Sequence, residues 1–260
     1  MIFLFNNGPG RFGNHIYNIY YLQTLSKKYG HNFWIKKSNY LNRYFYFDKG
    51  KNDKQSIFKP IRFITNKGLN KELSIYYNYI LIPPLLGNNF FSLLNNLDFK
   101  LKDKFSSIRI DKSKYNVAIH FRGTDFHSWD KNAILDSKYY INCIEEISKS
   151  KKKLTFYLYT DDYKLDSYND VIKFLMLKKS TFFKGNLELD FIYDFKEISE
   201  CDCIISSPST FCIWASVFGI QGKTIFHSKK WIDHRIRNND KFWIDLKLND
   251  SKFYKELILK

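Results

Sequence analysis

Apolar segments alternate with helical segments throughout the second half of the sequence. The segments "NVAIHF" from Asn116, "LTFYLYT" from Leu154 and "CIISS" from Cys203 are largely apolar runs, and "KTIFHS" from Lys223 has an apolar centre. Such runs are typical of strands that are buried on both faces, in a parallel sheet that helices cover. Helices are expected between them, near residues 137–148, 170–177, 187–200 and 209–218. The pattern predicts a Rossmann-like α/β domain.

A similar unit begins the sequence. The strand "MIFLF" precedes the loop "GPGRFGN", a helix is expected from about Asn14 to Tyr29 with Gly30 as its stop, and "NFWI" is expected to form a second strand. Residues 40–110 are less regular, and within them "LGNNFFSLLNNLDF" is expected to be helical. We therefore expect an α/β fold of two Rossmann-like domains, residues 1–110 and 111–260.

The chain carries 42 basic and 26 acidic residues, a formal charge of +16. This excess suits a nucleic acid, an anionic membrane surface or an acidic small substrate. Lys, Asn, Ile, Phe and Tyr are abundant and have A/T-rich codons, so a bias in genome composition can also account for much of the basic excess. The charge alone therefore does not choose a partner.

The longest apolar stretch is interrupted by Pro83 and Pro84 and falls short of the roughly 20 residues that a membrane span requires. No secretory signal is recognised. We therefore expect a cytoplasmic protein that can contact an anionic membrane surface peripherally. The four cysteines lack metal-ligand spacing and are expected to be free thiols.

The loop "GPGRFGN" holds Gly8, Gly10 and Gly13 at G-x-G-x-x-G spacing between the first strand and the first helix. Backbone N–H groups in such a loop can approach a diphosphate, and the helix dipole favours the negative charge. Many ordinary turns share the pattern, so the loop is a weak signal by itself.

Polar residues follow three strands of the second domain, in "HFRGTDF", "TDD" and "SSPSTF". The carboxyl ends of parallel strands meet at one edge of the sheet, where ligands bind. Arg122 offers a planar fork for phosphate oxygens, and Gly123 would let the backbone come close to a ligand. The alternative for Arg122 is a salt bridge with Asp125, and His120 is either a core residue or a ligand contact.

Two further groups at this edge have alternative roles. Asp161 and Asp162 could accept hydrogen bonds from a nucleobase or ribose, or one of them could cap the following helix. Ser209 can begin a helix whose N-terminus receives a phosphate, and it can be the N-cap residue at the same time.

In sequence order, "GPGRFGN", "HFRGTDF" with its H-x-R-x-x-D pattern, "YTDD" and "SPSTFCIWAS" resemble the motifs of the α-1,2-fucosyltransferase family. They also resemble the wider fucosyltransferase superfamily, which includes protein O-fucosyltransferases and α-1,6-fucosyltransferases. The resemblance spans Gly8 to Gly219.

The resemblance implies a GT-B glycosyltransferase with two facing domains. GDP-fucose would be held mainly by the second domain, a glycan acceptor would enter between the domains, and transfer would invert the anomeric centre without a metal or other cofactor. Arg122, Asn14 and Asp125 would lie at the reacting centre. The donor contacts that it implies are Gly10, Arg11, Phe12, Gly13, His120, Asp161, Asp162, Ser209, Thr210 and Phe211.

The acceptor hydroxyl must lose a proton during transfer. The sequence offers Asp125, His127 and Asp130 just beyond Arg122, and His15 beside Asn14. We expect the general base among these four and place Asp125 first, although Asp125 could instead orient Arg122.

Two other functions are compatible with parts of the sequence. An NADP-dependent oxidoreductase would use the glycine loop, with Lys36 and Lys37 near a 2′-phosphate, but it leaves "HFRGTD" and "SSPSTF" without a task. A non-catalytic glycan-binding or nucleic-acid-binding module would use the charge and the aromatic residues. It does not explain why polar residues follow the strands, so we favour the glycosyltransferase.

Overall fold

We describe the protein from a computed structural model. The described residues are 1–5, 11–36, 39–47, 59–64, 73, 76–81, 99–105, 109–129, 131–151, 153–185, 190–219, 223–228 and 254–259. The chain divides into two compact units, Met1–Lys104 and Phe105–Lys260. Each unit has its own parallel sheet and is described by itself.

The first unit begins with the predicted βαβ arrangement. Strand β1 (Ile2–Leu4), helix α1 (Phe12–Tyr29) and strand β2 (Phe33–Ile35) follow one another, and β1 pairs with β2 in parallel. Gly30 ends α1 at φ +65°, where its N–H bonds the carbonyl of Lys27. That left-handed conformation favours glycine, so the predicted stop is confirmed.

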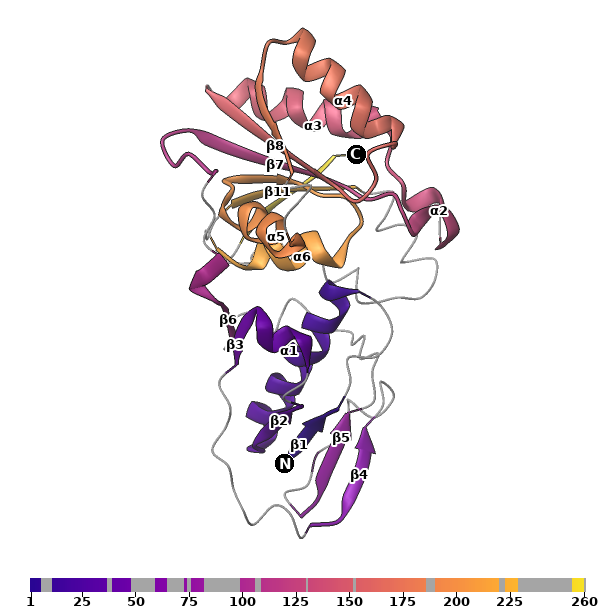
Figure 1. The fold of residues 1–260 in the computed structure, drawn as a ribbon, viewed down its shortest axis with the longest axis vertical. Coiled ribbons are helices and arrows are strands. Elements are labelled where there is room, and N and C mark those ends of the chain that lie inside the picture. The colour runs from indigo at the N-terminus through magenta and orange to yellow at the C-terminus, as the bar shows by residue number, and fades with distance from the viewer. Residues whose placement is uncertain are drawn as a thin grey trace. The chain divides into compact units, whose positions relative to one another are not determined.

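The rest of this sheet comes from the region that the sequence left unassigned. Strands β4 (Ile61–Ile64) and β5 (Asn78–Leu81) complete a parallel sheet of order β2-β1-β5-β4 (Figure 1). A short 3-10 helix, Tyr40–Arg43, leads into β3 (Phe45–Phe47), which pairs antiparallel with β6 (Phe99–Leu101). A second 3-10 helix covers Asp103–Phe105.

The helix expected over "LGNNFFSLLNNLDF" lies outside the described residues except for Phe99. That residue belongs to strand β6, so the helix prediction is wrong at Phe99. The β3–β6 pair is a short two-stranded ladder between residues more than 50 positions apart. A pairing of this kind leaves no local periodicity that a sequence pattern could detect.

The second unit alternates strands and helices along the chain. After β7 (Tyr115–Phe121) come the short helix α2 (Phe126–Trp129) and a 3-10 turn, Lys131–Ala133. The remaining elements are α3 (Ser137–Ser150), β8 (Leu154–Thr160), α4 (Asp166–Leu177), β9 (Thr181–Lys184), α5 (Phe191–Glu200), β10 (Cys203–Ile205), α6 (Thr210–Val217), β11 (Lys223–Ser228) and β12 (Tyr254–Leu259).

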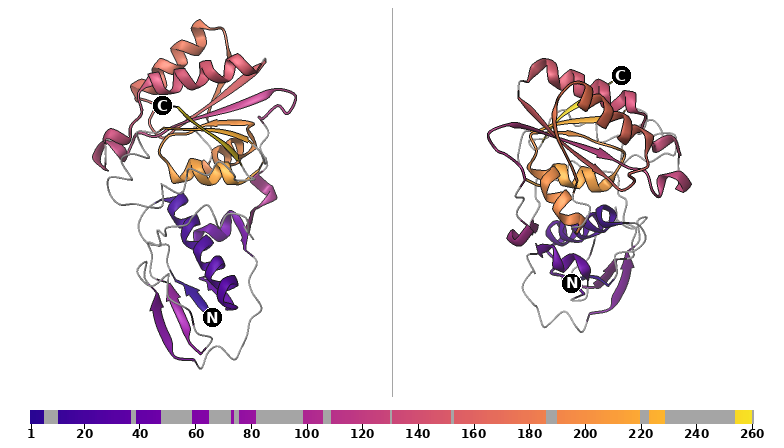
Figure 2. Two further views of the ribbon diagram at one scale, coloured as in Figure 1. Left: turned by 180° about the vertical axis from the view of Figure 1, so that it is seen from behind. Right: turned by 45° about the horizontal axis from the view of Figure 1, so that its top comes forward.

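The six strands form one parallel sheet of order β12-β11-β10-β7-β8-β9. If β7 is counted as the first strand of the unit, the order reads 6-5-4-1-2-3, which is the doubly wound order. The chain adds strands on one side of β7 and then, from β10 on, on the other side. Helices α3 and α4 cover one face and α5 and α6 the other, as both figures show (Figure 1, Figure 2). The predicted Rossmann-like domain is therefore confirmed in its elements and strand direction.

The core explains why the strands are apolar on both faces. Val117, Ile119 and Phe121 of β7 pack in a cluster with Ile144 of α3 and Val171 of α4. The residues between them point to the other face, where the ring of His120 stacks on Phe211 of α6 at 5.8 Å between centroids. A strand sandwiched in this way has no solvent-facing side, so its pattern does not alternate.

Helix α4 begins at Asp166, four residues earlier than expected, and its N-cap residue is Leu165 without a side-chain capping bond. No capping signal therefore marks its start. Helix α5 begins at Phe191, where the side chain of Asp190 accepts the N–H of Ile192 at 3.2 Å.

Tyr139 connects helix α3 to the half of the sheet that contains β10 and β11. Its hydroxyl lies 3.1 Å from the carbonyl oxygen of Ser206, which follows β10, and 2.9 Å from that of Phe226, within β11. Burial raises the pKa of Tyr139, so the group remains a donor. One hydroxyl thus bonds carbonyl groups of two neighbouring strand segments.

Across the described ranges, none of the helices combines the length and the apolar composition that crossing a bilayer requires. The four cysteines, Cys143, Cys201, Cys203 and Cys212, are buried free thiols, as expected.

Candidate functional site

The candidate site lies at the carboxyl edge of the second sheet, where the strand order reverses. In open α/β sheets this reversal leaves a crevice outside the strand ends, and ligands bind there. His120 near the end of β7 and Ser207 just after β10 lie on the two sides of the reversal. The Nδ1 atom of His120 is 2.6 Å from the Ser207 hydroxyl, which links the two strand ends.

His120 is a buried, neutral histidine. Its side chain stacks on Phe211, and the residue is 6% exposed. Burial, helped by the nearby positive charge of Arg122, lowers the pKa of His120 to about 4. A neutral ring in this position can hydrogen-bond without adding charge to the site.

The buried state of His120 predicts a pH dependence of stability. The unfolded histidine binds a proton below its ordinary pKa of about 6.5, whereas the folded one resists protonation until about pH 4. The free energy of unfolding should therefore fall by about 2 kcal/mol between pH 7 and pH 5 through this residue. Urea denaturation of the wild type and of His120→Asn across this range measures the effect.

The difference between these two pH profiles isolates His120 from His31, whose pKa burial also lowers. Asp161 titrates below the measured range because its pKa is lowered rather than raised. Parallel profiles for wild type and variant would contradict a neutral buried His120.

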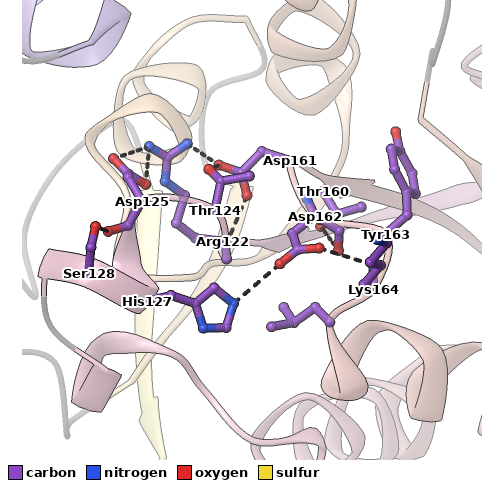
Figure 3. A network of polar contacts seen from close by, with 12 residues as sticks. Arg122, Thr124, Asp125, His127, Ser128, Thr160, Asp161, Asp162, Tyr163 and Lys164 are labelled. Atoms are coloured by element: carbon purple, nitrogen blue, oxygen red, sulfur yellow. Dashed lines mark hydrogen bonds and ion pairs between the residues drawn. The ribbon is translucent and has the colours of Figure 1, made fainter.

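Arg122 is held between two carboxylates. Its Nη1 atom lies 2.5 Å from Asp161 Oδ2, and its Nη2 atom lies 2.8 and 2.9 Å from the two oxygens of Asp125 (Figure 3). The Phe126 ring lies 5.4 Å from the guanidinium carbon, and the side chain is 13% exposed. The salt bridge with Asp125 is therefore present, and a second one accompanies it.

The parallel register of β7 and β8 explains the pairing of Arg122 with Asp161. Phe121 lies opposite Thr160, so the next residue of each strand end meets its neighbour. Asp161 also accepts the Gly123 N–H at 2.9 Å and the Thr124 hydroxyl at 2.7 Å. Burial alone would raise the pKa of Asp161, but Arg122 and these two donors outweigh it and lower that pKa. The carboxylate therefore stays ionised.

Asp162 is fixed by its own turn. Its N–H donates to the Thr160 hydroxyl at 3.0 Å, and its Oδ1 atom accepts the Lys164 N–H at 3.0 Å. Its Oδ2 atom lies 3.3 Å from Nε2 of His127. The N-cap residue of α4 is Leu165, so the alternative that one of the two aspartates caps this helix is wrong.

Gly123 makes room for Asp162. A Cβ atom at position 123 would lie 2.7 Å from Asp162 Cβ and 2.8 Å from its Oδ2 atom. The space beside this glycine is thus filled by a protein side chain. The expected close approach at Gly123 exists, but Asp162 makes it, and the sequence did not indicate this partner.

The start of α6 is arranged as expected. Ser209 is its N-cap residue, makes no side-chain capping bond and is followed by Thr210 and Phe211 in the first turn. Ser206 and Ser207 are buried beside it. Helix N-termini carry unpaired N–H groups and partial positive charge, which suits a phosphate.

The predicted residues of the first domain lie around the start of α1. Arg11 is the N-cap residue and Phe12 the first helical residue, so the helix starts two residues earlier than expected and Gly13 is helical. Phe12 is buried against Tyr44 and Phe45. Gly10 lies outside the described residues, and the roles of Arg11, Phe12, Gly13 and Asn14 toward a donor stay predictions.

One ionic network was missed from the sequence. Arg109 donates from Nε to Glu197 Oε1 at 2.6 Å, pairs with the other oxygen through Nη2, and donates from Nη1 to the Lys184 carbonyl at 2.7 Å. The hydroxyl of Tyr159 donates to Glu197 at 3.0 Å. The available signal was a glutamate between Phe195 and Ile198, on the buried side of α5.

Within the described part of the chain, no three His, Cys, Asp or Glu side chains gather to hold a metal ion. Whether the reaction needs a metal stays a prediction.

A doubly wound parallel sheet with polar side chains at its carboxyl edge is the architecture of nucleotide-binding α/β proteins. The family model of Glycosyl transferase family 11 matches residues 75–247, and the chain belongs to this family. The expectation of a glycosyltransferase is thereby confirmed. No curated protein matches the sequence significantly.

Solved structures share the fold at low identity. POFUT1 in complex with GDP-fucose is similar with a TM-score of 0.51 at 9% identity, over 83% of this chain and 93% of that chain. A mutant of FUT1 from Arabidopsis thaliana in complex with GDP gives 0.52 at 8% identity, over 84% and 68%. The apo-form of POFUT1 gives 0.51 at 9%, over 99% and 97%. The predicted GT-B type of α/β fold is confirmed.

Proposed function

We propose that the protein transfers fucose from GDP-fucose to a hydroxyl of a glycan acceptor, with inversion and an α-1,2-type linkage. The family membership and the fold shared with POFUT1 and FUT1, whose structures contain GDP-fucose and GDP, support the donor. The observation that carries the proposal is the guanidinium of Arg122, held between Asp125 and Asp161 beside the strand reversal.

Arg122 is the proposed ligand of the donor diphosphate. A guanidinium has five N–H donors, so two carboxylates do not exhaust it. When the bond between fucose and phosphate breaks, the β-phosphate gains negative charge, and a fixed fork stabilises that charge. Asp125 and Asp161 orient the guanidinium. Because two carboxylates outnumber its single positive charge, the net attraction for a diphosphate has to come from other groups. We propose that the N-terminus of α6 at Ser209 supplies it.

Asp161 and Asp162 are the proposed acceptors for the nucleobase or the ribose. Asp161 and Asp162 each accept protein hydrogen bonds, but a carboxylate has about four lone-pair sites and can accept more. Loss of GDP affinity by roughly 1.5–3 kcal/mol in one of the two alanine variants would support this role, since that is the range for hydrogen bonds to charged groups.

GDP should stabilise the protein without added metal. Thermal unfolding is measured with GDP, UDP, ADP, GDP-fucose, GDP-mannose and NADPH, each with and without EDTA. At a concentration of 100 times Kd, GDP should add about 2.7 kcal/mol, which raises Tm by roughly 5–10 °C. A shift that EDTA abolishes would contradict metal independence.

The same panel tests the donor and the reaction class. A shift with NADPH but not with GDP would support the oxidoreductase alternative. Transfer from GDP-fucose to a panel of galactosides, followed by linkage analysis of the product, tests the acceptor class and the α-1,2-type linkage. Absence of transfer to every acceptor, despite GDP binding, would contradict the proposed acceptor class.

A further inference from the structure

A histidine–carboxylate pair lies next to the Arg122 cluster. Helix α2 begins directly after the Arg122 turn, and the N–H groups of Phe126 and His127 donate to the Gly123 carbonyl at 2.9 and 3.3 Å. The ring of Phe126 lies against Arg122. The ring of His127 lies against Asp162 instead (Figure 3). The same short helix therefore places one side chain on the fork and the next on the neighbouring carboxylate.

The carboxylate of this pair is held rigidly. Its Oδ1 atom is occupied by the Lys164 N–H, and its backbone N–H is occupied by the Thr160 hydroxyl. The missing Cβ of Gly123 leaves the space in which the side chain lies. Oδ2 therefore faces Nε2 of His127 in a fixed direction, at 3.3 Å. A carboxylate in this position selects the tautomer with the proton on Nε2 and the lone pair on Nδ1.

His127 differs from the other candidate bases in exposure and in partners. Its side chain is 54% exposed, while that of Asp162 is 19% exposed, so the ring is accessible and its partner is not. Asp125 has both oxygens on Arg122, and His15 of the first unit has Nδ1 2.5 Å from the Tyr40 hydroxyl. Asp130 lies outside the described residues.

We infer that His127 is the general base of the transfer and that Asp162 is its positioning residue, an inference that rests on the proposed fucosyl transfer. The acceptor O–H bond breaks and its proton goes to Nδ1 of His127. The acceptor oxygen forms a bond to the anomeric carbon, and the bond from that carbon to the β-phosphate breaks, with its electron pair leaving on GDP. The imidazolium is paired with Asp162 and returns its proton to water.

Removing the imidazole should lower kcat without weakening the donor. His127→Gln should lose about 100-fold or more in kcat, the usual contribution of a general base, while Kd for GDP and KM for GDP-fucose stay within about twofold. In His127→Gly, added imidazole should restore part of the lost turnover. A merely structural histidine would show no such rescue.

Asp162→Asn tests the tautomer. The Lys164 N–H needs an oxygen acceptor, so the asparagine keeps its oxygen there and turns its NH₂ group toward Nε2 of His127. Nε2 must then accept, the proton moves to Nδ1, and the base has no lone pair for the substrate. We expect a loss of about 100-fold in kcat, as for His127→Gln, with unchanged GDP affinity.

Asp170→Asn is the matched control, because Asp170 is an exposed carboxylate of α4 that pairs with Lys173 at 3.4 Å. It should behave as the wild type. Near wild-type kcat in folded His127→Gln would overturn the inference, and so would a loss of GDP affinity in Asp162→Asn with unchanged kcat. If the wild type neither binds GDP nor transfers fucose, the proposed function itself fails, which is a separate outcome.

Discussion

Arg122→Lys is expected to lower kcat by about 100-fold or more, with a smaller change in KM for GDP-fucose. A lysine keeps the positive charge but has one ammonium group on a flexible stem. It cannot reach Asp161 with one nitrogen, Asp125 with another and a phosphate with the donors that remain. The lost stabilisation belongs to the charge that develops on the leaving phosphate, so it appears in kcat rather than in ground-state binding.

The measurement compares initial rates of transfer from GDP-fucose by wild type and Arg122→Lys, with circular dichroism to verify folding. Arg62→Lys is the control, since the Arg62 guanidinium lies over the Tyr77 ring at 3.6 Å in the first unit and has no proposed role. Near wild-type turnover in a folded Arg122→Lys protein would mean that Arg122 only bridges Asp125 and Asp161.

Arg109→Met should lower the free energy of unfolding by about 3 kcal/mol or more, measured by urea denaturation. The carboxylate of Glu197 is 3% exposed, and removal of its partner leaves a buried charge without compensation. Only the Tyr159 hydroxyl among the bonds described above would still donate to it. Arg109→Met combined with Glu197→Met should recover most of the loss, because the uncompensated charge disappears.

Lys112→Met is the matched control for this stability effect. Lys112 pairs with Glu200, also on α5, at 2.5 Å, but its side chain is 59% exposed. Exposed pairs of this kind contribute about 0–1 kcal/mol. Equal losses in Arg109→Met and Lys112→Met would contradict a special role for the buried pair.

The sequence predicted the second unit better than the first, for a physical reason. Strands β8 and β11 occupy the expected residues, Leu154–Thr160 and Lys223–Ser228. The long apolar run of β8 marks a strand buried on both faces, and the short apolar centre of β11 follows the same strand–helix alternation. The short strands β3 and β6 depend on a distant antiparallel partner. Local periodicity contains no information about such a partner.

In the candidate site, too, the position of the residues could be predicted from the sequence, whereas their bonding partners could not. The rule that ligands bind at the carboxyl edge brought Arg122 and Asp161 to one place, since it depends only on strand direction. Which groups hydrogen-bond to each other depends instead on the register of the strands and on the room left by neighbouring side chains. Gly123 therefore signalled a close approach, but only the structure shows that the side chain of Asp162 makes it.

The hydroxyl of Tyr139 has a mechanical consequence. It belongs to the helix between β7 and β8, yet it bonds the Ser206 carbonyl just after β10 and the Phe226 carbonyl within β11. The half of the sheet formed by β7–β9 is thus connected through α3 to the half formed by β10–β12, at the edge where the strand order reverses. Separation of the two halves of the sheet at this edge breaks these partly buried bonds, so we expect the edge to open cooperatively. The amide hydrogens of β7 and β10 should then exchange with solvent together rather than strand by strand.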